Sequence, residues 1–370
     1  MRILLLHVPA GAGHQRACEA IAAAFHERGL QIDVTVKDAL IGGNRIYRWA
    51  FTKGYIRLIH SFPFLWGIAY YLTDIRPLNG LMQRLHRLSN AMHGSRLSSY
   101  LIEKKPDVII GTHFFPMEVA GWLKSRGKIT SRLITVVTDY QPHALWAAPG
   151  IDTYVVASPE AGEELRKRGI PPDKIKLIGI PVDPKFSFNG TRPELVKKLG
   201  LKEGTFTVLV GSGGAGTGPV VALVKALCES QEPVQMLVVA GSNTSLFEKL
   251  VRMKPSLRHP VHVYGFINNM DELMEIADLV VSKPGGLTCT EALAKQVPLV
   301  LVAPIPGQET NNAKTMVSMG VAVWARNVQA AAGWVQKLRN NRPLLEEMRQ
   351  KAKEQACPDA AARITRLVMP

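Results

Sequence analysis

The first candidate catalytic residue is His14, which follows a turn of small residues near the start of the chain. Residues 9–14 read Pro-Ala-Gly-Ala-Gly-His, after an apolar run at residues 3–8 and before an alanine-rich segment of helical character. Small side chains let a ligand approach the backbone, and the start of a helix favours negative charge. An imidazole placed there could take a proton from an acceptor hydroxyl. The alternative is a histidine that only caps the helix.

A second motif is rich in glycine and could bind phosphate. Residues 211–218 read Gly-Ser-Gly-Gly-Ala-Gly-Thr-Gly and follow a short apolar run at residues 207–210. Backbone amides of such a loop can cradle a phosphate. The Lys-Ser/Thr pair of a P-loop is missing, which disfavours triphosphate hydrolysis. The alternative is a merely flexible turn.

A third motif, at residues 282–294, predicts a diphosphate site. An apolar run ends at Val281, Gly285 and Gly286 form a turn without side chains, and a helix is expected from about Leu287. The unpaired N–H groups at that helix start would face a diphosphate. Glu291, one turn further on, could accept two hydrogen bonds from a ribose diol. The alternative is a solvated helix residue.

A fourth motif, at residues 304–312, offers hydrogen-bonding groups for a hexose. Gln308, Glu309 and Asn312 supply two amides and a carboxylate within five residues. Such groups suit a ring of hydroxyls, although a capped helix start would explain them equally. The chain has no D-x-D pair for a divalent ion. The four motifs therefore predict a nucleotide-sugar site without a metal or other cofactor, in which backbone amides and a helix dipole face the diphosphate.

Parallel strands are expected to position these motifs. Short β-branched runs alternate with helix-length segments in both halves of the chain, which is typical of doubly wound α/β domains. We expect an α/β fold with two Rossmann-like domains that face a central cleft containing the site. The predicted domains are residues 1–184 and residues 185–357. A terminal helix at residues 358–370 is expected to pack back on the first domain.

Composition narrows the class of protein. The chain has 370 residues, 46% of them hydrophobic, and a net charge of +15. No run approaches the roughly 18 apolar residues of a spanning helix, and no signal peptide is recognisable. Its four cysteines are far apart, so neither a zinc site nor a disulfide framework is indicated. A reducing cytoplasm and an anionic partner are the resulting expectations.

The charge and the aromatic residues gather in one stretch. Residues 37–105 carry eleven Lys or Arg against three acids, and residues 47–71 hold nine aromatics. Apolar and aromatic side chains can enter a bilayer boundary while cations bind anionic lipid. A buried helical pair with solvated arginines is the alternative. Nucleic acid is not expected, because no recognition motif accompanies the basic residues.

The motifs together resemble the GT-B glycosyltransferases of family 28. Within that family they are similar to the monogalactosyldiacylglycerol synthases and the bacterial processive diacylglycerol glucosyltransferases. The resemblance runs from residue 1 to about residue 326. The matching segments are residues 10–17, 112–116, 138–146, 282–288 and 308–312.

The resemblance implies transfer of glucose or galactose from a UDP-sugar to the hydroxyl of diacylglycerol, with inversion, at the cytoplasmic face of the membrane. His14 matches the family's catalytic or acceptor-site histidine, and Asp139 is the rival base. The implied donor residues are Gly213, Gly214, Phe266 on the uracil, Gly285, Gly286, Thr288, Glu291, Gln308, Glu309 and Asn312. The implied acceptor residues are Gly13, His113, His143 and Trp146. By the resemblance, the first predicted domain is the acceptor and membrane-docking domain and the second binds the UDP-sugar. Trp49, Phe64 and Trp66 are the membrane residues expected from the aromatic and basic stretch.

Three alternatives stay open at this point. A UDP-GlcNAc transferase acting on a lipid-linked peptidoglycan precursor would share the fold and the donor chemistry. A UDP-sugar epimerase would share the two-domain shell without needing the aromatic stretch, and a lipid-binding module would need no donor residues. The sequence leaves the hexose, the number of sugars added and the oligomeric state undetermined.

Overall fold

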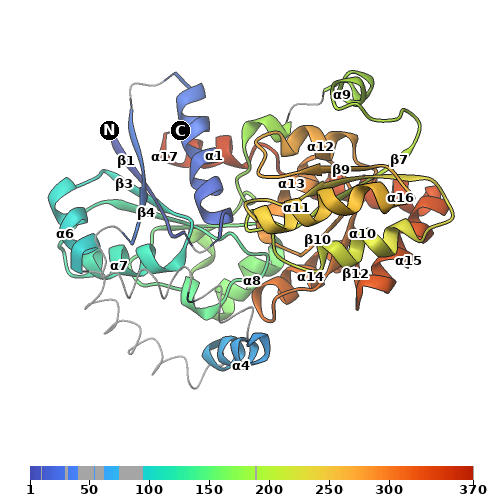
Figure 1. Cartoon of the computed structure of the whole chain (residues 1–370). Helices are drawn as coiled ribbons and strands as arrows, with labels where there is room; N and C mark the ends of the chain where they lie inside the picture. Colours follow the sequence, from blue (N-terminus) through green and yellow to red (C-terminus); the bar gives the residue numbers. More distant parts are fainter. Residues whose placement is uncertain are drawn as a thin grey trace. The chain divides into compact units, whose positions relative to one another are not determined.

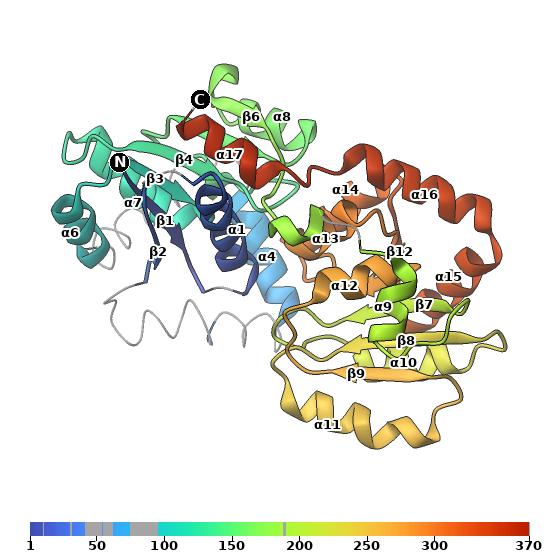
Figure 2. The same ribbon diagram turned by 90° about the horizontal axis from the view of Figure 1, so that it is seen from above.

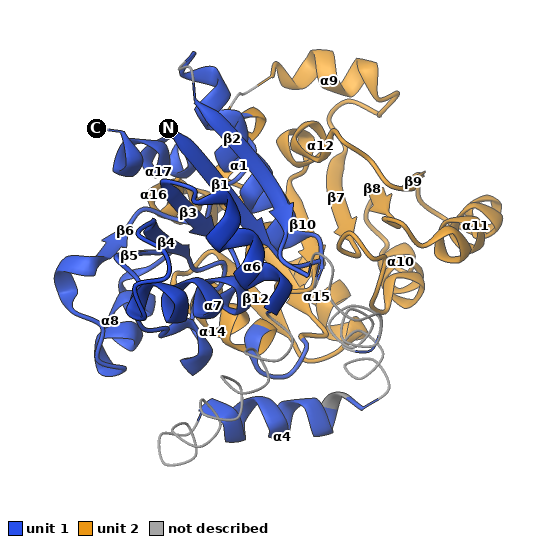
Figure 3. Cartoon of the chain, turned by 90° about the vertical axis from the view of Figure 1, so that its left-hand side faces the viewer, with its two compact units in different colours: residues 1–184, 305–308, 359–370 blue, residues 185–304, 309–358 orange. Residues whose placement is uncertain are grey.

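The chain forms two compact units (Figure 3). The computed structural model describes residues 1–9, 11–29, 32–40, 54, 62–74, 95–187 and 190–369. Unit 1 contains Met1–Pro184, Ile305–Gln308 and Asp359–Pro370, and unit 2 contains Lys185–Pro304 and Glu309–Pro358. Trp49, one of the predicted membrane residues, lies outside the described residues, as do the neighbouring basic residues 45, 48, 53 and 57.

Unit 1 is built on a parallel sheet. Its described strands have the order β2-β1-β3-β4-β5-β6, with a crossover at β1. Five of the six residues of β1 are buried, as expected for a strand covered on both faces. The strand bounds are β1 (Arg2–His7), β2 (Asp33–Asp38), β3 (Val108–Gly111), β4 (Arg132–Val136), β5 (Thr153–Val156) and β6 (Ile175–Leu177).

The helices of unit 1 are α1 (Gly13–Glu27), α4 (Pro63–Asp74), α6 (Ser95–Lys104), α7 (Phe114–Ser125), α8 (Pro159–Lys167) and α17 (Ala360–Val368), with the short 3₁₀ turns η2 (Ala144–Trp146) and η3 (Pro172–Lys174). A further turn, η4 (Pro184–Ser187), leads into unit 2. Helices α1, α7 and α8 pack on the sheet (Figure 1). The last helix, α17, lies alongside α1 (Figure 2), where Ala20, Ala24 and Ala361 pack together. Arg28 Nη1 donates to the carbonyl oxygen of Met369 at 3.1 Å.

Unit 2 repeats the architecture. Its described strands have the order β12-β11-β10-β7-β8-β9, all parallel. Their bounds are β7 (Phe206–Gly211), β8 (Val234–Val239), β9 (Val261–Tyr264), β10 (Leu279–Ser282), β11 (Leu299–Val302) and β12 (Ala322–Ala325). The helices and the 3₁₀ turn are α9 (Arg192–Lys198), α10 (Val220–Cys228), α11 (Thr244–Met253), η5 (Lys254–Ser256), α12 (Met270–Ile276), α13 (Gly286–Ala294), α14 (Gln308–Ser318), α15 (Val328–Asn340) and α16 (Arg342–Gln355).

The predicted α/β class with two Rossmann-like domains is confirmed. Because the strands of each sheet are parallel, the loops that follow them share one edge, which is where such sheets bind ligands. The bend at Gly11 and Ala12 lies between β1 and α1. In unit 2, the loops after β7, β10 and β11 contain the other three motifs. Each sheet therefore gathers its motifs at its carboxyl edge.

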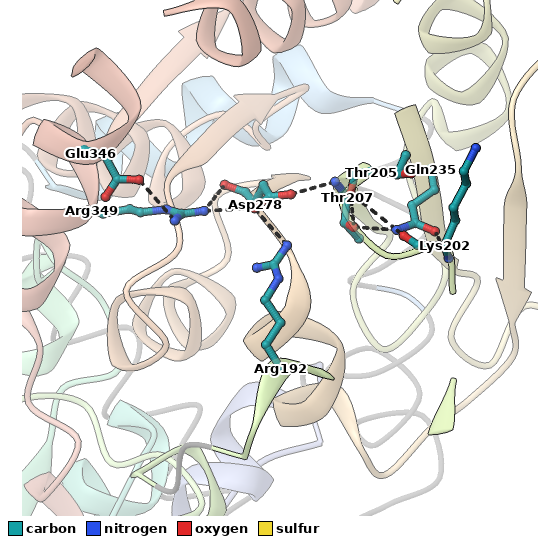
Figure 4. A network of polar contacts seen from close by, with 8 residues as sticks. All are labelled: Arg192, Lys202, Thr205, Thr207, Gln235, Asp278, Glu346 and Arg349. Carbon is teal, nitrogen blue, oxygen red and sulfur yellow. Dashed lines mark hydrogen bonds and ion pairs between the residues drawn. The ribbon is translucent and has the colours of Figure 1, made fainter. Parts of the chain in front are cut away.

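At the opposite edge of the unit 2 sheet, Asp278 joins four elements (Figure 4). Its Oδ2 accepts from the backbone N–H of Thr207 at 2.8 Å. Its Oδ1 accepts from Arg192 Nη2 at 3.0 Å and from Arg349 Nη2 at 3.1 Å. The side chain thereby connects α9 and α16 to the amino-terminal ends of β7 and β10.

Replacing Asp278 with alanine is expected to lower the free energy of unfolding by about 2 kcal/mol, because the buried N–H of Thr207 and two guanidinium groups lose a charged acceptor. Urea denaturation measures the change. The control is Arg192→Ala, since the Arg192 side chain is 44% exposed. That variant should lose less than about 1 kcal/mol. Equal losses would contradict a central role for the carboxylate.

Candidate functional site

His14 is the second residue of α1, after Gly13, and its ring is held by two threonines. Its Nδ1 lies 2.6 Å from the carbonyl oxygen of Thr112 and 3.1 Å from Thr138 Oγ1. A carbonyl oxygen only accepts hydrogen bonds, so Nδ1 carries the proton and donates it. The neutral ring then has Nε2 as its proton acceptor. This tautomer is the one that a general base requires.

The surroundings of His14 also keep the ring neutral. Burial lowers the pKa of His14 to about 4, against the opposing effect of its hydrogen bond to Thr112, and nearby His7 lowers it further. The residue keeps some solvent exposure although protein atoms enclose most of its ring. His113 lies edge-on to it, with ring centroids 4.8 Å apart, and its pKa is well below the usual value, again through burial. Both imidazoles are uncharged at neutral pH.

The lowered pKa of His14 predicts an unusual pH profile. A lower pKa means that the unprotonated imidazole persists to lower pH. If His14 is the base, kcat/KM should stay constant from pH 7.5 to about 5 and fall only as the pH approaches about 4. Initial rates across this range measure it, with circular dichroism at each pH to confirm folding. An inflection near pH 6.5 would contradict this environment for the base.

A second polar cluster follows β4. Asp139 is 6% exposed and its Oδ1 accepts a hydrogen bond from Gln308 Nε2. His143 is 7% exposed, and its Nδ1 accepts from the N–H of Leu145 at 3.2 Å, which caps η2. Trp146 is 2% exposed and packs with Phe114 in the core of unit 1. It supports this loop from within and does not face a lipid surface.

The predicted membrane residues Phe64 and Trp66 belong to α4. Phe64 is 75% exposed, whereas Trp66 is half-buried. Other exposed apolar side chains of this segment are Phe62, Leu65, Ile68, Tyr71 and Leu72. A contiguous exposed apolar face of this kind marks an interaction surface. In the described part of the chain, no helix combines the length and apolarity needed to cross a membrane.

The glycine-rich loop after β7 is held by the next loop of unit 2. Gly216 has φ +66°, and a Cβ there would lie 2.1 Å from the carbonyl oxygen of Ala240, so glycine is required. Ser242 donates from both N–H and Oγ to the carbonyl oxygen of Gly214, each at 3.0 Å. Asn243 Nδ2 donates to the carbonyl oxygen of Gly216 at 2.9 Å. These contacts fix the loop that contains the predicted phosphate residues Gly213 and Gly214.

The sequence analysis missed Ser242 and Asn243. The available signal was a helix cap, since an Asn follows a Gly-Ser turn directly after a buried strand. Asn243 indeed caps α11, because its side chain accepts from the N–H of Leu246 at 2.9 Å. The cap alone gives no indication that the same amide also holds a glycine carbonyl.

The loop between β10 and α13 has the backbone that a diphosphate site needs. α13 begins at Gly286, and its N-cap residue Gly285 offers no side chain to the first amides. Asn312 Nδ2 donates to the carbonyl oxygen of Pro284 at 3.2 Å and so fixes the turn. Thr288 is half-buried and Glu291 is 4% exposed. The exposure of Glu291 is too low for a solvated surface residue.

Charged and aromatic groups lie among the predicted donor residues. Lys283 Nζ lies 3.6 Å from Glu309 Oε1, and both side chains are 15% exposed. The sequence analysis gave Lys283 no role, although a cation beside the glycine turn suits a diphosphate. Phe266, in the loop after β9, is 59% exposed. Its contact with uracil stays a prediction.

Among the described residues, no three His, Cys, Asp or Glu side chains gather as metal ligands.

Comparisons with known proteins cover nearly the whole chain. Residues 14–182 match the family model of monogalactosyldiacylglycerol (MGDG) synthase, and residues 205–364 match the glycosyltransferase family 28 C-terminal domain. The processive diacylglycerol beta-glucosyltransferase of Bacillus subtilis (strain 168) is 30% identical over 356 residues, which span 95% of this chain and 91% of that protein.

Solved structures share the fold at lower identity. Acinetobacter baumannii MurG has a TM-score of 0.65 at 17% identity, covering 100% of this chain and 99% of its own. UDP-GlcNAc 2-epimerase from Neisseria meningitidis, bound to UDP-GlcNAc, has a TM-score of 0.65 at 13% identity, with both chains covered completely (100% and 100%). At these identities the likeness concerns the fold alone.

Proposed function

Because the chain belongs to glycosyltransferase family 28, in the group of monogalactosyldiacylglycerol synthases and processive diacylglycerol glucosyltransferases, we propose that it transfers a hexose from a UDP-sugar to the hydroxyl of diacylglycerol. The product is a β-linked glycolipid. The observation that carries the proposal is the neutral His14, whose protonated Nδ1 is held by Thr112 and whose Nε2 is the proton acceptor. The relatives' names indicate the acceptor.

The transfer is a single displacement with inversion. His14 Nε2 takes the proton of the diacylglycerol hydroxyl, the oxygen forms a bond to the anomeric carbon, and the bond from that carbon to the UDP phosphate breaks. Asp139 is the rival base. The departing diphosphate is stabilised by the amides at the start of α13 and by Lys283, in the manner of an anion at a helix N-terminus. No metal or other cofactor takes part in this scheme.

The acceptor side meets a membrane through α4. Its exposed apolar side chains suit the headgroup boundary, and the sequence around it carries eleven basic against three acidic residues over residues 37–105. Cations near an anionic surface each contribute about 1 kcal/mol. We therefore place the enzyme at the cytoplasmic face of the membrane as a peripheral protein, since its acceptor stays in the bilayer.

The deciding experiment supplies vesicles of anionic phospholipid that contain diacylglycerol, together with radiolabelled UDP-glucose, UDP-galactose or UDP-GlcNAc. Chromatography of the extracted lipids should show a labelled glycosyl diacylglycerol with one of the two hexoses, with and without EDTA. Proton NMR of the product should show a β linkage. Conversion of the labelled UDP-sugar to its epimer without any labelled lipid indicates an epimerase and would overturn the proposal, as would transfer to a lipid-linked peptidoglycan precursor alone.

A further inference from the structure

The α4 helix has two chemically different faces. Its exposed side is apolar and includes Phe64, at 75% exposure. Its other side contains Gly67, Tyr70, Thr73 and Asp74, which are buried or half-buried. Residues three and four apart share a helix face, so this second set forms one stripe. The proposed lipid contact and this inward stripe therefore belong to the same helix.

The inward stripe holds the loop that follows Asp139. His143 Nδ1 accepts from Leu145, so Nε2 carries the proton and donates it to the carbonyl oxygen of Tyr70 at 3.1 Å. The Tyr70 ring lies against the His143 ring, with centroids 4.6 Å apart. Asp74 Oδ1 accepts from the N–H of Ala144 at 2.8 Å. The acceptor-side loop is thus attached to α4 by both backbone and ring contacts.

The same stripe packs on the segment of unit 1 that leads to Gln308. Gly307 has φ +93°, and a Cβ there would lie 2.6 Å from carbons of the Tyr70 ring. A Cβ at Gly67 would lie 2.9 Å from the Cβ of Pro306. Contacts this close require glycine at both positions. Gln308 follows at once and donates to Asp139, so the Tyr70 ring lies between the two segments that meet in this hydrogen bond.

We propose that Tyr70 is a positioning residue that fixes Asp139 and Gln308 for hexose transfer and joins them to the lipid-facing helix. The inference rests on the proposed function, because its readout is that transfer. Tyr70 itself contacts neither substrate in this scheme. Its ring sets the separation between the His143 loop and Gly307, and its carbonyl group fixes the His143 ring. A misplacement of about 1 Å at a reacting centre can cost about a hundredfold in rate.

The test compares Tyr70→Ala with Tyr100→Ala. Tyr100 is a half-buried tyrosine of α6 in the same unit, and Lys37 Nζ lies 5.9 Å from the centre of its ring. Tyr70→Ala should lower kcat between about tenfold and a hundredfold, with the KM for the UDP-sugar within about threefold and sedimentation with anionic vesicles unchanged. Tyr100→Ala should keep kcat within about twofold of wild type, although it removes the same side chain. Tyr71→Ala, on the exposed face, should weaken sedimentation.

Two further variants keep the proposal falsifiable. Tyr70→Phe retains the ring and should restore most of kcat. If Tyr70→Ala does not fold, Gly307→Ala tests the same contact from the other side and should also lower kcat. The inference would be overturned if Tyr70→Ala and Tyr100→Ala lost kcat equally. It would also be overturned if Tyr70→Ala lost vesicle binding but kept its kcat on acceptor dispersed in detergent. Absence of any transfer by the wild-type protein would instead overturn the proposed function.

Discussion

Replacing His14 with alanine is expected to lower kcat by about a thousandfold while leaving the Kd for UDP within about twofold of wild type, because the variant loses only the proposed base. The ring contacts Thr112 and Thr138 of unit 1, whereas the loops predicted to bind the diphosphate belong to unit 2. Initial rates with saturating donor give kcat, and calorimetric titration with UDP gives Kd. The control is His26→Ala, an exposed histidine on the same helix.

The same pair of measurements separates the alternatives for the base. Equal losses in turnover and in UDP binding would assign His14 a structural role. Asp139→Asn retains the side-chain shape and removes the charge. If that variant loses far more turnover than His14→Ala, Asp139 is the base and His14 a neighbour that orients the acceptor.

Replacing Glu291 with alanine is expected to weaken UDP binding about thirtyfold, because two hydrogen bonds from the ribose to a carboxylate contribute about 2 kcal/mol. The residue is only 4% exposed, so its carboxylate must find polar partners inside unit 2. Calorimetric titration with UDP measures the effect. The control is Glu347→Ala, on α16, whose side chain is 57% exposed and pairs with Lys351.

A structural role for Glu291 would give a different pattern. If the carboxylate only stabilises α13, Glu291→Ala should lower the melting temperature and leave the Kd for UDP unchanged. Loss of affinity with an unchanged melting temperature supports the ribose contact. Loss of both would require Glu291→Gln, which keeps the side-chain volume, to separate the two effects.

Much of the fold was predictable because its signals are local. The apolar run at residues 3–8 overlaps β1, which pairs with β2 from Arg2, opposite Asp33, and with β3 from Ile3, opposite Val108. The alanine-rich segment after it becomes α1. Glycine turns directly after buried strands indicated which motifs would lie at a carboxyl sheet edge. The period of the hydrophobic residues, the lengths of the apolar runs and the residue types of the turns are enough to predict the fold class and the order of strands and helices along the chain.

The contacts inside the candidate site were not predictable, because they join residues far apart in the chain. The Gln308–Asp139 hydrogen bond spans 169 residues, and the His14–Thr138 contact spans 124. Spacing along one chain does not reveal which loops meet. Tyr70 shows the same limit: by composition it belongs to an exposed aromatic stretch, whereas its position on the inward stripe of α4 depends on helix phase and on packing against His143.

The ion pair between Lys283 and Glu309 bears on how the protein discriminates among anions. The two side chains are only 15% exposed, so a diphosphate that bound Lys283 would compete with Glu309 for the same ammonium group. A sugar nucleotide can offset that competition, because its hydroxyls can donate to the Glu309 carboxylate. Under the proposed function, anions without hydroxyl donors should therefore bind more weakly than a UDP-sugar.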